Sequence, residues 1–182
     1  SIRRLEFDLL SVDIGESWPV PVTVVHGARP GPTVTLLGAV HGNELVGPLA
    51  LTYLSGPNFI GSGKAIDPEA LSGTVRIVPI VNMPGYKMKS RYMPDGRDLN
   101  RSFPGKPDSN TSYRVANRFW KEIISGSDYV IDLHTAAVGR TNMPQIRANL
   151  AHASSNRIAR SFGIEAILDN VGPKGSLRRV TN

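Results

Sequence analysis

The chain has 182 residues and 40% of them are hydrophobic, which is enough for one domain with an apolar core. It contains no cysteine, so disulfide bonds and zinc sites built on thiolates are excluded. Lys and Arg outnumber Asp and Glu by 21 to 15, and the net charge of +6 suits either nucleic acid or small anions. No apolar run approaches the ~18 residues of a membrane span, and charges interrupt the N-terminal stretch where a signal peptide is apolar. We therefore expect a soluble, cytoplasmic domain with no membrane partner.

Apolar, β-branched runs alternate with helical patterns along the chain. Strands are predicted over residues 5–14, 20–26, 33–38, 74–81 and 128–135, with shorter strands over 143–150 and 165–170. Helices are predicted from about residue 44, over 113–125 and over 153–162. Strands that alternate with helices, several of them apolar throughout, indicate an α/β sandwich with a largely parallel sheet.

The position of Pro48 predicts where the first helix begins. Proline lacks an amide hydrogen and is tolerated only in the first turn of a helix. The helix is therefore expected to start close to Glu44 or Leu45, with Asn43 as its N-cap.

Two predicted strands end in a histidine, at the edge of the sheet where open α/β folds bind their ligands. His41 follows the run TVTLLGAV, His134 follows DYVIDL, and Glu44 lies about one turn beyond His41. Two imidazoles and one carboxylate are the three-ligand set of a catalytic zinc site, which leaves a fourth position for water. In this interpretation Asp132 accepts a hydrogen bond from a ligand imidazole. The alternative is that no metal binds here: His41 would then be an ordinary histidine in a turn, and Glu44 a carboxylate that the dipole of the following helix favours.

Residues 82–110 form a long polar segment that is rich in glycine and proline. Such long loops in compact domains usually carry function. This one holds Arg91, Arg97 and Arg101, with Asn100 beside the last. Guanidinium groups bind carboxylates through two parallel hydrogen bonds, and an amide completes the recognition of a carboxylate or carbonyl. The alternative is that each of these arginines, considered by itself, is an ordinary charged residue on the solvated surface.

Three motifs carry a resemblance to a known family. GAVHGNE at residues 38–44, RDLNRSFPG at 97–105 and DLHT at 132–135 occur in this order. Together they resemble the succinylglutamate desuccinylase/aspartoacylase family, which belongs to the wider group of zinc carboxypeptidases. The likeness covers residues 33–135 and is weaker in GPKGSLRR at 172–179. It implies a three-layer α/β/α sandwich with a mixed, largely parallel central sheet, as in the zinc carboxypeptidases.

The resemblance also implies a metal site and an activity. His41, Glu44 and His134 would hold one Zn2+ per chain. The activity would be hydrolysis of the amide or ester bond of an N-acylated amino acid, or of a similar small carboxylate, by metal-activated water.

Residues of the long loop would bind the substrate in this family. Asn100 and Arg101 would bind its carboxylate, and Arg91 would polarise the scissile carbonyl. Arg97 is nearer to the Asn-Arg pair and stays open as an alternative to Arg91.

One family feature does not occur in the sequence. The family has a catalytic glutamate in a later strand, in an E-x-G context, whereas Glu165 lies in the unrelated context FGIEAIL. We therefore expect residues 1–182 to be a zinc-dependent hydrolase domain that ends before the catalytic glutamate and before the family's C-terminal β-rich part.

Other functions stay open at this point. A metallocarboxypeptidase that acts on peptides would carry the same motifs. A non-catalytic basic binding module would explain the positive charge, but no aromatic residues accompany the basic ones as in single-strand binders, so no nucleic-acid partner is expected. Four arginines are interpreted as a solvated face: Arg157, Arg160, Arg178 and Arg179. Whether the protein forms a homo-oligomer is left open.

Three further features are interpreted as structural. GSGKA at residues 61–65 is not a phosphate-binding loop, because Asn58 stands where that motif has a glycine and Ala65 where it has Ser or Thr. His26 and His152 are interpreted as capping or surface histidines.

Overall fold

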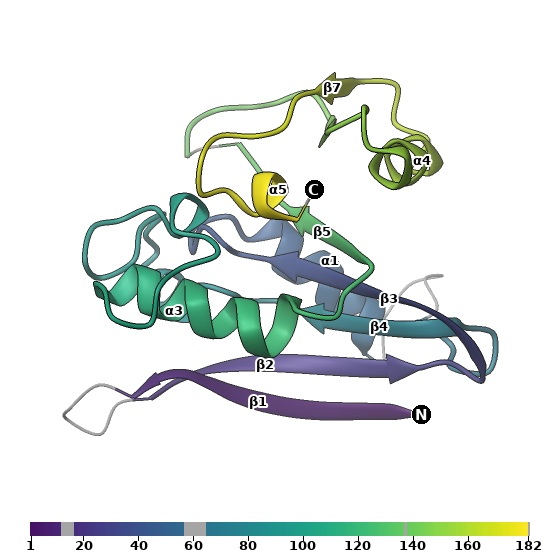
Figure 1. The fold of residues 1–182 in the computed structure, drawn as a ribbon, viewed down its shortest axis with the longest axis horizontal. Coiled ribbons are helices and arrows are strands. Elements are labelled where there is room, and N and C mark those ends of the chain that lie inside the picture. The colour runs from purple at the N-terminus through teal and green to yellow at the C-terminus, as the bar shows by residue number, and fades with distance from the viewer. Residues whose placement is uncertain (12–16, 57–64, 137, 182) are drawn as a thin grey trace.

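The structure is a computed structural model that describes residues 1–11, 17–56, 65–136 and 138–181 (Figure 1). Its strands are β1 (Ile2–Ser11), β2 (Ser17–His26), β3 (Arg29–Gly38), β4 (Ser72–Val78), β5 (Tyr129–Leu133), β6 (Ile146–Ala148) and β7 (Ile167–Asp169). Its helices are α1 (Val46–Ser55), α2 (Met83–Lys87), α3 (Thr111–Phe119), α4 (Ala153–Ser161) and α5 (Leu177–Val180), with a 3-10 turn η1 (Leu99–Arg101) and a π-helical turn η2 (Trp120–Ile124). The end of the first predicted strand, residues 12–14, and all but the last residue of GSGKA lie outside the described residues.

Five strands form one sheet in the order β1-β2-β4-β3-β5. β3 pairs in parallel with β4 and β5, whereas β2 pairs antiparallel with β4 and with β1. Because β3 has a strand on each side and helices over both faces, its two faces are apolar, with Leu36 on one and Leu37 on the other. The predicted mixed sheet is confirmed, and its parallel part is formed by β4, β3 and β5.

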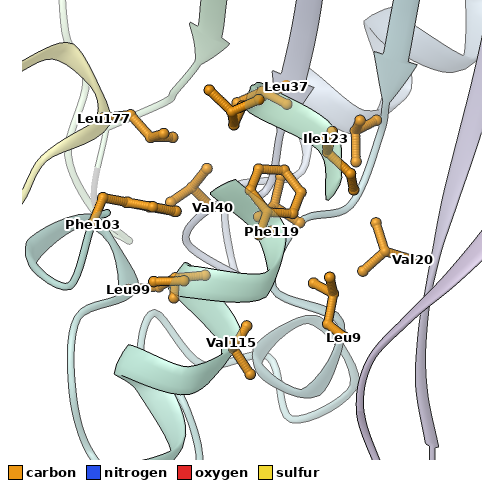
Figure 2. Close-up of a cluster of buried hydrophobic side chains, with 14 of the residues drawn as sticks. Leu9, Val20, Leu37, Val40, Leu99, Phe103, Val115, Phe119, Ile123 and Leu177 are labelled. Atoms are coloured by element: carbon orange, nitrogen blue, oxygen red, sulfur yellow. The ribbon is translucent and has the colours of Figure 1, made fainter. Parts of the chain in front are cut away.

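Helices cover both faces of this sheet and make three layers (Figure 1). On one face, Leu51 of α1 packs in a cluster with Val25, Val75 and Ile77. On the other face, Phe119 of α3 lies in the larger cluster (Figure 2). The side chains labelled around it in Figure 2 are Leu9, Val20, Leu37, Val40, Leu99, Phe103, Val115, Ile123 and Leu177.

The chain turns between β3 and α1. α1 begins at Val46 with Leu45 in the N-cap position, and no side chain caps it. The prediction of Asn43 as N-cap is therefore wrong, and the helix starts slightly later than expected. The reason is a turn over residues 41–44, in which the Glu44 amide donates to the His41 carbonyl at 3.1 Å. Pro48 still lies in the first helical turn, where its missing N–H is not needed.

The long segment over residues 82–110 is not purely a loop, because it contains α2 and η1. The side chain of Asn82 accepts a hydrogen bond from the Gly85 amide at 2.9 Å and so caps α2. The side chain of Asp98 accepts from the Asn100 amide at 2.8 Å and caps η1. β4 ends at Val78 rather than at residue 81. The caps fix the local backbone of α2 and η1, and the Asn82 amide donates to the Ala39 carbonyl just beyond β3 at 3.0 Å.

The C-terminal part adds a second, smaller sheet. β6 and β7 pair in parallel, and α4 connects them. Leu177 of α5 is buried in the larger core cluster and attaches this part to the domain. In the described residues no helix is long and apolar enough to span a membrane.

Candidate metal centre

Three side chains meet at the carboxyl ends of β3 and β5. His41 lies three residues after β3, His134 follows β5 directly, and Glu44 precedes α1. Because β3 and β5 are parallel neighbours, their carboxyl ends lie side by side. The imidazole ring centres are 4.9 Å apart. One nitrogen of each imidazole and one oxygen of Glu44 all lie within 4.8 Å of one another. The structure thus brings together the three predicted ligands.

Both imidazoles turn the same nitrogen toward Glu44. His41 Nδ1 lies 2.8 Å from Glu44 Oε1, and His134 Nδ1 lies 2.9 Å from Glu44 Oε2. The Thr135 amide also donates to Glu44 Oε2, at 3.0 Å. The carboxylate therefore stands between the two rings with both oxygens engaged.

The other nitrogen of each imidazole faces a second carboxylate. His41 Nε2 lies 3.1 Å from Asp98 Oδ1, and His134 Nε2 lies 2.7 Å from Asp132 Oδ2. A ring N–H that donates to such a carboxylate leaves the lone pair of Nδ1 directed at the centre. Asp132 was expected in this position, but the role of Asp98 was not predicted. Its place two residues before Asn100, in RDLNR, was its signal in the sequence.

The centre keeps its carboxylate ionised. Burial raises the pKa of Glu44, but hydrogen bonds from His134 and His41 outweigh this and lower the pKa to about 2. Burial lowers the pKa of His134, but the charge of Asp132 and the hydrogen bonds to both carboxylates raise it to about 10. Burial likewise lowers the pKa of His41, and its bonds to Asp98 and Glu44 raise it overall. The carboxylates of this site therefore favour a positive charge on the imidazoles or between them.

The donor set fits a zinc ion. Two imidazole nitrogens and a carboxylate oxygen are ligands that zinc prefers, at ~2.0–2.2 Å from the metal. Ligand atoms at that distance from one ion are separated by ~3–4 Å, and the spacing here is close to this range. A divalent cation can also take the place of the protons that join the imidazoles to Glu44.

Arg91 reaches this centre from the long loop. Its two terminal nitrogens lie 3.4 Å from Glu44 Oε1 and 3.0 Å from Asp98 Oδ2. Burial raises the pKa of Asp98, but the hydrogen bond from His41 and the charges of His41 and Arg91 hold it well below its usual range. Arg97 is exposed, and its charge acts on Asp95. Of the two arginines left open by the sequence, the structure places Arg91 at the centre.

Asn100 and Arg101 lie beside His134. Asn100 Nδ2 is 3.4 Å from His134 Nε2, and its Oδ1 accepts from the Leu177 amide at 2.9 Å. Arg101 is exposed and donates from Nη1 to the Asn100 carbonyl at 2.6 Å. The side-chain oxygen of Asn100 therefore accepts from the first residue of α5, and its amide nitrogen lies at the outer nitrogen of His134.

Arg178 lies partly buried rather than on a fully solvated face. Burial lowers its pKa, and the positive charges of Arg147 and Arg101 lower it further. The segment before Arg178 packs against η1 and the residues that follow it: a Cβ atom at Gly175 would overlap the Arg101 backbone, and the Phe103 amide donates to the Gly175 carbonyl at 3.0 Å. In the sequence, Arg178 was indicated by the resemblance of GPKGSLRR, residues 172–179, to the family.

The histidines interpreted as structural lie on the exposed surface. His26 Nδ1 is 2.9 Å from Thr74 Oγ1, and His152 Nδ1 is 2.9 Å from Ser154 Oγ. Glu165 is also exposed.

Comparison with known proteins identifies the family of this chain. The sequence model of the succinylglutamate desuccinylase/aspartoacylase catalytic domain matches residues 30–182. The chain belongs to this family. Its predicted fold class, an α/β sandwich of the kind found in zinc carboxypeptidase-like deacylases, agrees with the structures of its relatives.

The chain is similar to a curated deacetylase and to two solved structures of this family. N-alpha-acetyl-L-2,4-diaminobutyric acid deacetylase of Halomonas elongata is 41% identical over 123 residues, which is 67% of this chain and 33% of the relative. A succinylglutamate desuccinylase/aspartoacylase from Rhodobacter sphaeroides is 32% identical with a TM-score of 0.71, over 84% of this chain and 46% of its own. A succinylglutamate desuccinylase from Silicibacter sp. TM1040 is 26% identical with a TM-score of 0.78, over 99% of this chain and 55% of its own. The chain therefore spans a third of the curated relative and about half of these two structures, and it is related to deacylating hydrolases.

Proposed function

We propose that the protein is a zinc-dependent deacylase that hydrolyses the amide or ester bond of an N-acylated amino acid or a similar small carboxylate. His41, Glu44 and His134 hold the ion. The observation that carries this proposal is the orientation of both imidazoles, which turn Nδ1 to Glu44 and Nε2 to an outer carboxylate. When bound, zinc acts as a Lewis acid: it polarises a carbonyl group and lowers the pKa of a bound water molecule to about 7.

Arg91 is the candidate for binding the carbonyl oxygen. Its side chain is 32% exposed, so part of it is accessible to solvent. It lies within 3.4 Å of Glu44, which places its donors next to the metal ligands. A preorganised donor at a developing oxyanion lowers the barrier by ~3 kcal/mol.

The arginines beside Asn100 support a substrate that carries a carboxylate. Arg101 follows Asn100 in the chain, and the positive charges of Arg101 and Arg147 act on Arg178. Such guanidinium groups bind a carboxylate through paired, charge-assisted hydrogen bonds. The name of the Halomonas relative, an acetyl-diaminobutyric acid deacetylase, supports an N-acylated amino acid as this substrate.

The proton acceptor for water is a separate group. Glu44, Asp98 and Asp132 are each bonded to an imidazole, so these carboxylates hold ligands and do not take protons from water. We assign the proton transfer to the glutamate that the family resemblance implies.

Metal analysis tests the site independently of turnover. Elemental analysis of purified protein should give about one zinc per chain, and His41→Ala or His134→Ala should abolish it, whereas His152→Ala should retain it. Undiminished zinc in the first two variants would refute the assignment. On the protein as it occurs naturally, assays with N-acyl amino acids and with short peptides then separate a deacylase from a metallocarboxypeptidase.

A further inference from the structure

Asn100 lies between the candidate metal centre and α5. The nitrogen of its side chain is 3.4 Å from His134 Nε2, and the oxygen is 2.9 Å from the Leu177 amide. Figure 1 shows α5 close to the carboxyl end of β5, the strand that His134 follows. We propose that Asn100 is a positioning residue, which holds α5 at the metal centre and so fixes Arg178 beside it. Its effect on a substrate carboxylate, through Arg178, rests on the proposed function.

The Leu177 amide determines which way the side chain of Asn100 points. Leu177 is the first residue of α5, and the N–H groups in the first turn of a helix have no acceptor inside the helix. A backbone N–H can only donate, so the atom of Asn100 that faces it is the oxygen. The nitrogen then faces His134. This contact therefore gives α5 an acceptor and keeps Asn100 in one orientation.

The backbone of Asn100 is attached to the other side of the centre. Its amide donates at 2.8 Å to Asp98 Oδ1, the same oxygen that lies 3.1 Å from His41 Nε2. Asn100 thus contacts the partner of one candidate ligand through its backbone and the second ligand, His134, through its side chain. A residue held at both ligands is a firm point of attachment for α5.

The segment before α5 packs on the same turn of the chain. A Cβ atom at Gly175 would overlap the backbone of Arg101, so the two backbones are in direct contact. The Phe103 amide donates to the Gly175 carbonyl at 3.0 Å. Leu177 is 1% exposed and lies in the larger core cluster with Phe103 (Figure 2). These contacts place α5 next to η1, and the bond to Asn100 extends the attachment to the metal centre.

The position of Arg178 depends on this attachment, because it follows Leu177 directly. A Cβ atom at Gly172 would lie 2.9 Å from Arg178 Nε, so the arginine side chain passes over that glycine. The positive charge of Arg101, the residue after Asn100, acts on Arg178 and opposes its approach. Without the bond to Asn100, this repulsion favours a displaced α5. We therefore expect Arg178 to leave the centre when Asn100 is removed.

Amide exchange tests the attachment without any need for turnover. In the full protein, Asn100→Ala should raise the exchange rate of the Leu177 amide at least about tenfold by NMR, because the acceptor is lost. Asn100→Asp keeps an acceptor oxygen and should retain the protection. Asn110→Ala is the matched control, since Asn110 accepts from the Tyr113 amide at the start of α3 in the same way. Unchanged exchange of Leu177 in Asn100→Ala would overturn the proposal.

A double variant tests whether Asn100 acts through Arg178. With an N-acetyl amino acid as substrate, Asn100→Ala should raise KM about tenfold and change kcat little, as the loss of carboxylate binding does. In a protein that already carries Arg178→Ala, the same change should raise KM less than about twofold, because the residue through which it acts is gone. Equal increases in both backgrounds would mean that Asn100 binds the substrate itself, and the positioning role would be wrong.

Gly175→Ala tests the attachment without a change to Asn100. The added Cβ should push the segment away from Arg101 and raise KM as Asn100→Ala does. Gly163→Ala is the control, because its φ of 68° resembles the 76° of Gly175 but no atom lies within 4 Å of the added Cβ. A normal KM in Gly175→Ala would contradict the proposal. If the wild type hydrolyses no N-acetyl amino acid, the proposed function fails, and the exchange of the Leu177 amide still decides whether Asn100 holds α5.

Discussion

His41 Nε2 lies 3.1 Å from Asp98 Oδ1, although 57 residues separate the two in the chain. The carboxylate comes from the turn that begins η1, and it binds Arg91 with its other oxygen at 3.0 Å. One residue of the long loop therefore orients both a predicted metal ligand and the arginine beside it.

This contact predicts a loss of metal affinity when Asp98 is changed. Asp98→Asn keeps the size of the side chain but removes the charge that orients His41, and we expect zinc affinity to fall about 10- to 100-fold. Asp132→Asn should do the same through His134. Competition with a chelator of known affinity measures this, and Asp108→Asn, an exposed change in the same loop, is the control. Equal zinc affinity in all variants would show that neither Asp98 nor Asp132 contributes to metal binding.

Arg91 should affect turnover without affecting metal binding. Arg91→Lys keeps the positive charge but loses the fork that reaches Glu44 and Asp98 together. If the guanidinium stabilises an oxyanion, kcat should fall by ~10²–10³ while the zinc content stays constant. Arg97→Lys is the matched control. If instead Arg97→Lys lowers kcat and Arg91→Lys does not, the oxyanion donor is Arg97 and not Arg91.

Gly42 holds the turn between His41 and Glu44 against α2. A Cβ atom at this position would overlap the backbone of Gly85 and Tyr86. Gly42→Ala should therefore displace the turn and lower zinc affinity as well as the melting temperature. Gly56→Ala, at the end of α1, serves as the control. A variant with normal zinc affinity would show that α2 does not fix this turn.

Asp95 connects the long loop to the start of α3. It accepts a hydrogen bond from the Ser112 amide at 2.9 Å, close to the positive end of the helix. Asp95→Ala should lower the free energy of unfolding by about 1 kcal/mol at neutral pH, as the loss of a helix cap does. Chemical denaturation measures this, with Asp108→Ala as the control.

The contribution of Asp95 should depend on pH. Partial burial raises its pKa, but hydrogen bonds from Ser112 outweigh this and lower it below the usual 3.8. A lowered pKa stabilises the folded state fully above 3.8, and the effect is lost as the pH falls through the folded value. The difference between wild type and Asp95→Ala should therefore shrink below pH 4. A difference that grows on acidification would contradict this.

Metal removal should lower thermal stability. An ion that binds only the folded state stabilises it by about 4 kcal/mol at 1,000 times its dissociation constant. Chelation should therefore lower the melting temperature of the wild type, and added zinc should restore it. His41→Ala should show no such response, and calorimetry compares the two proteins. A zinc response of equal size in the variant would place the ion elsewhere.

The sequence by itself predicted the mixed sheet, and it singled out the three side chains that the structure brings together at the candidate metal centre. Apolar runs of β-branched residues mark strands through local periodicity, and the site of an open α/β sheet follows the strand ends. His41 and His134 could therefore be placed side by side, and the structure finds their rings 4.9 Å apart.

Only the tertiary structure decided how the loops complete the centre. It gave His41 the partner Asp98, placed Arg91 rather than Arg97 beside Glu44, and left Asn43 without a capping role. These outcomes depend on close packing between segments far apart in the chain, such as Gly42 on α2 and Leu177 on Asn100. Local patterns carry no information on such contacts, because their free energy arises only when the segments have met.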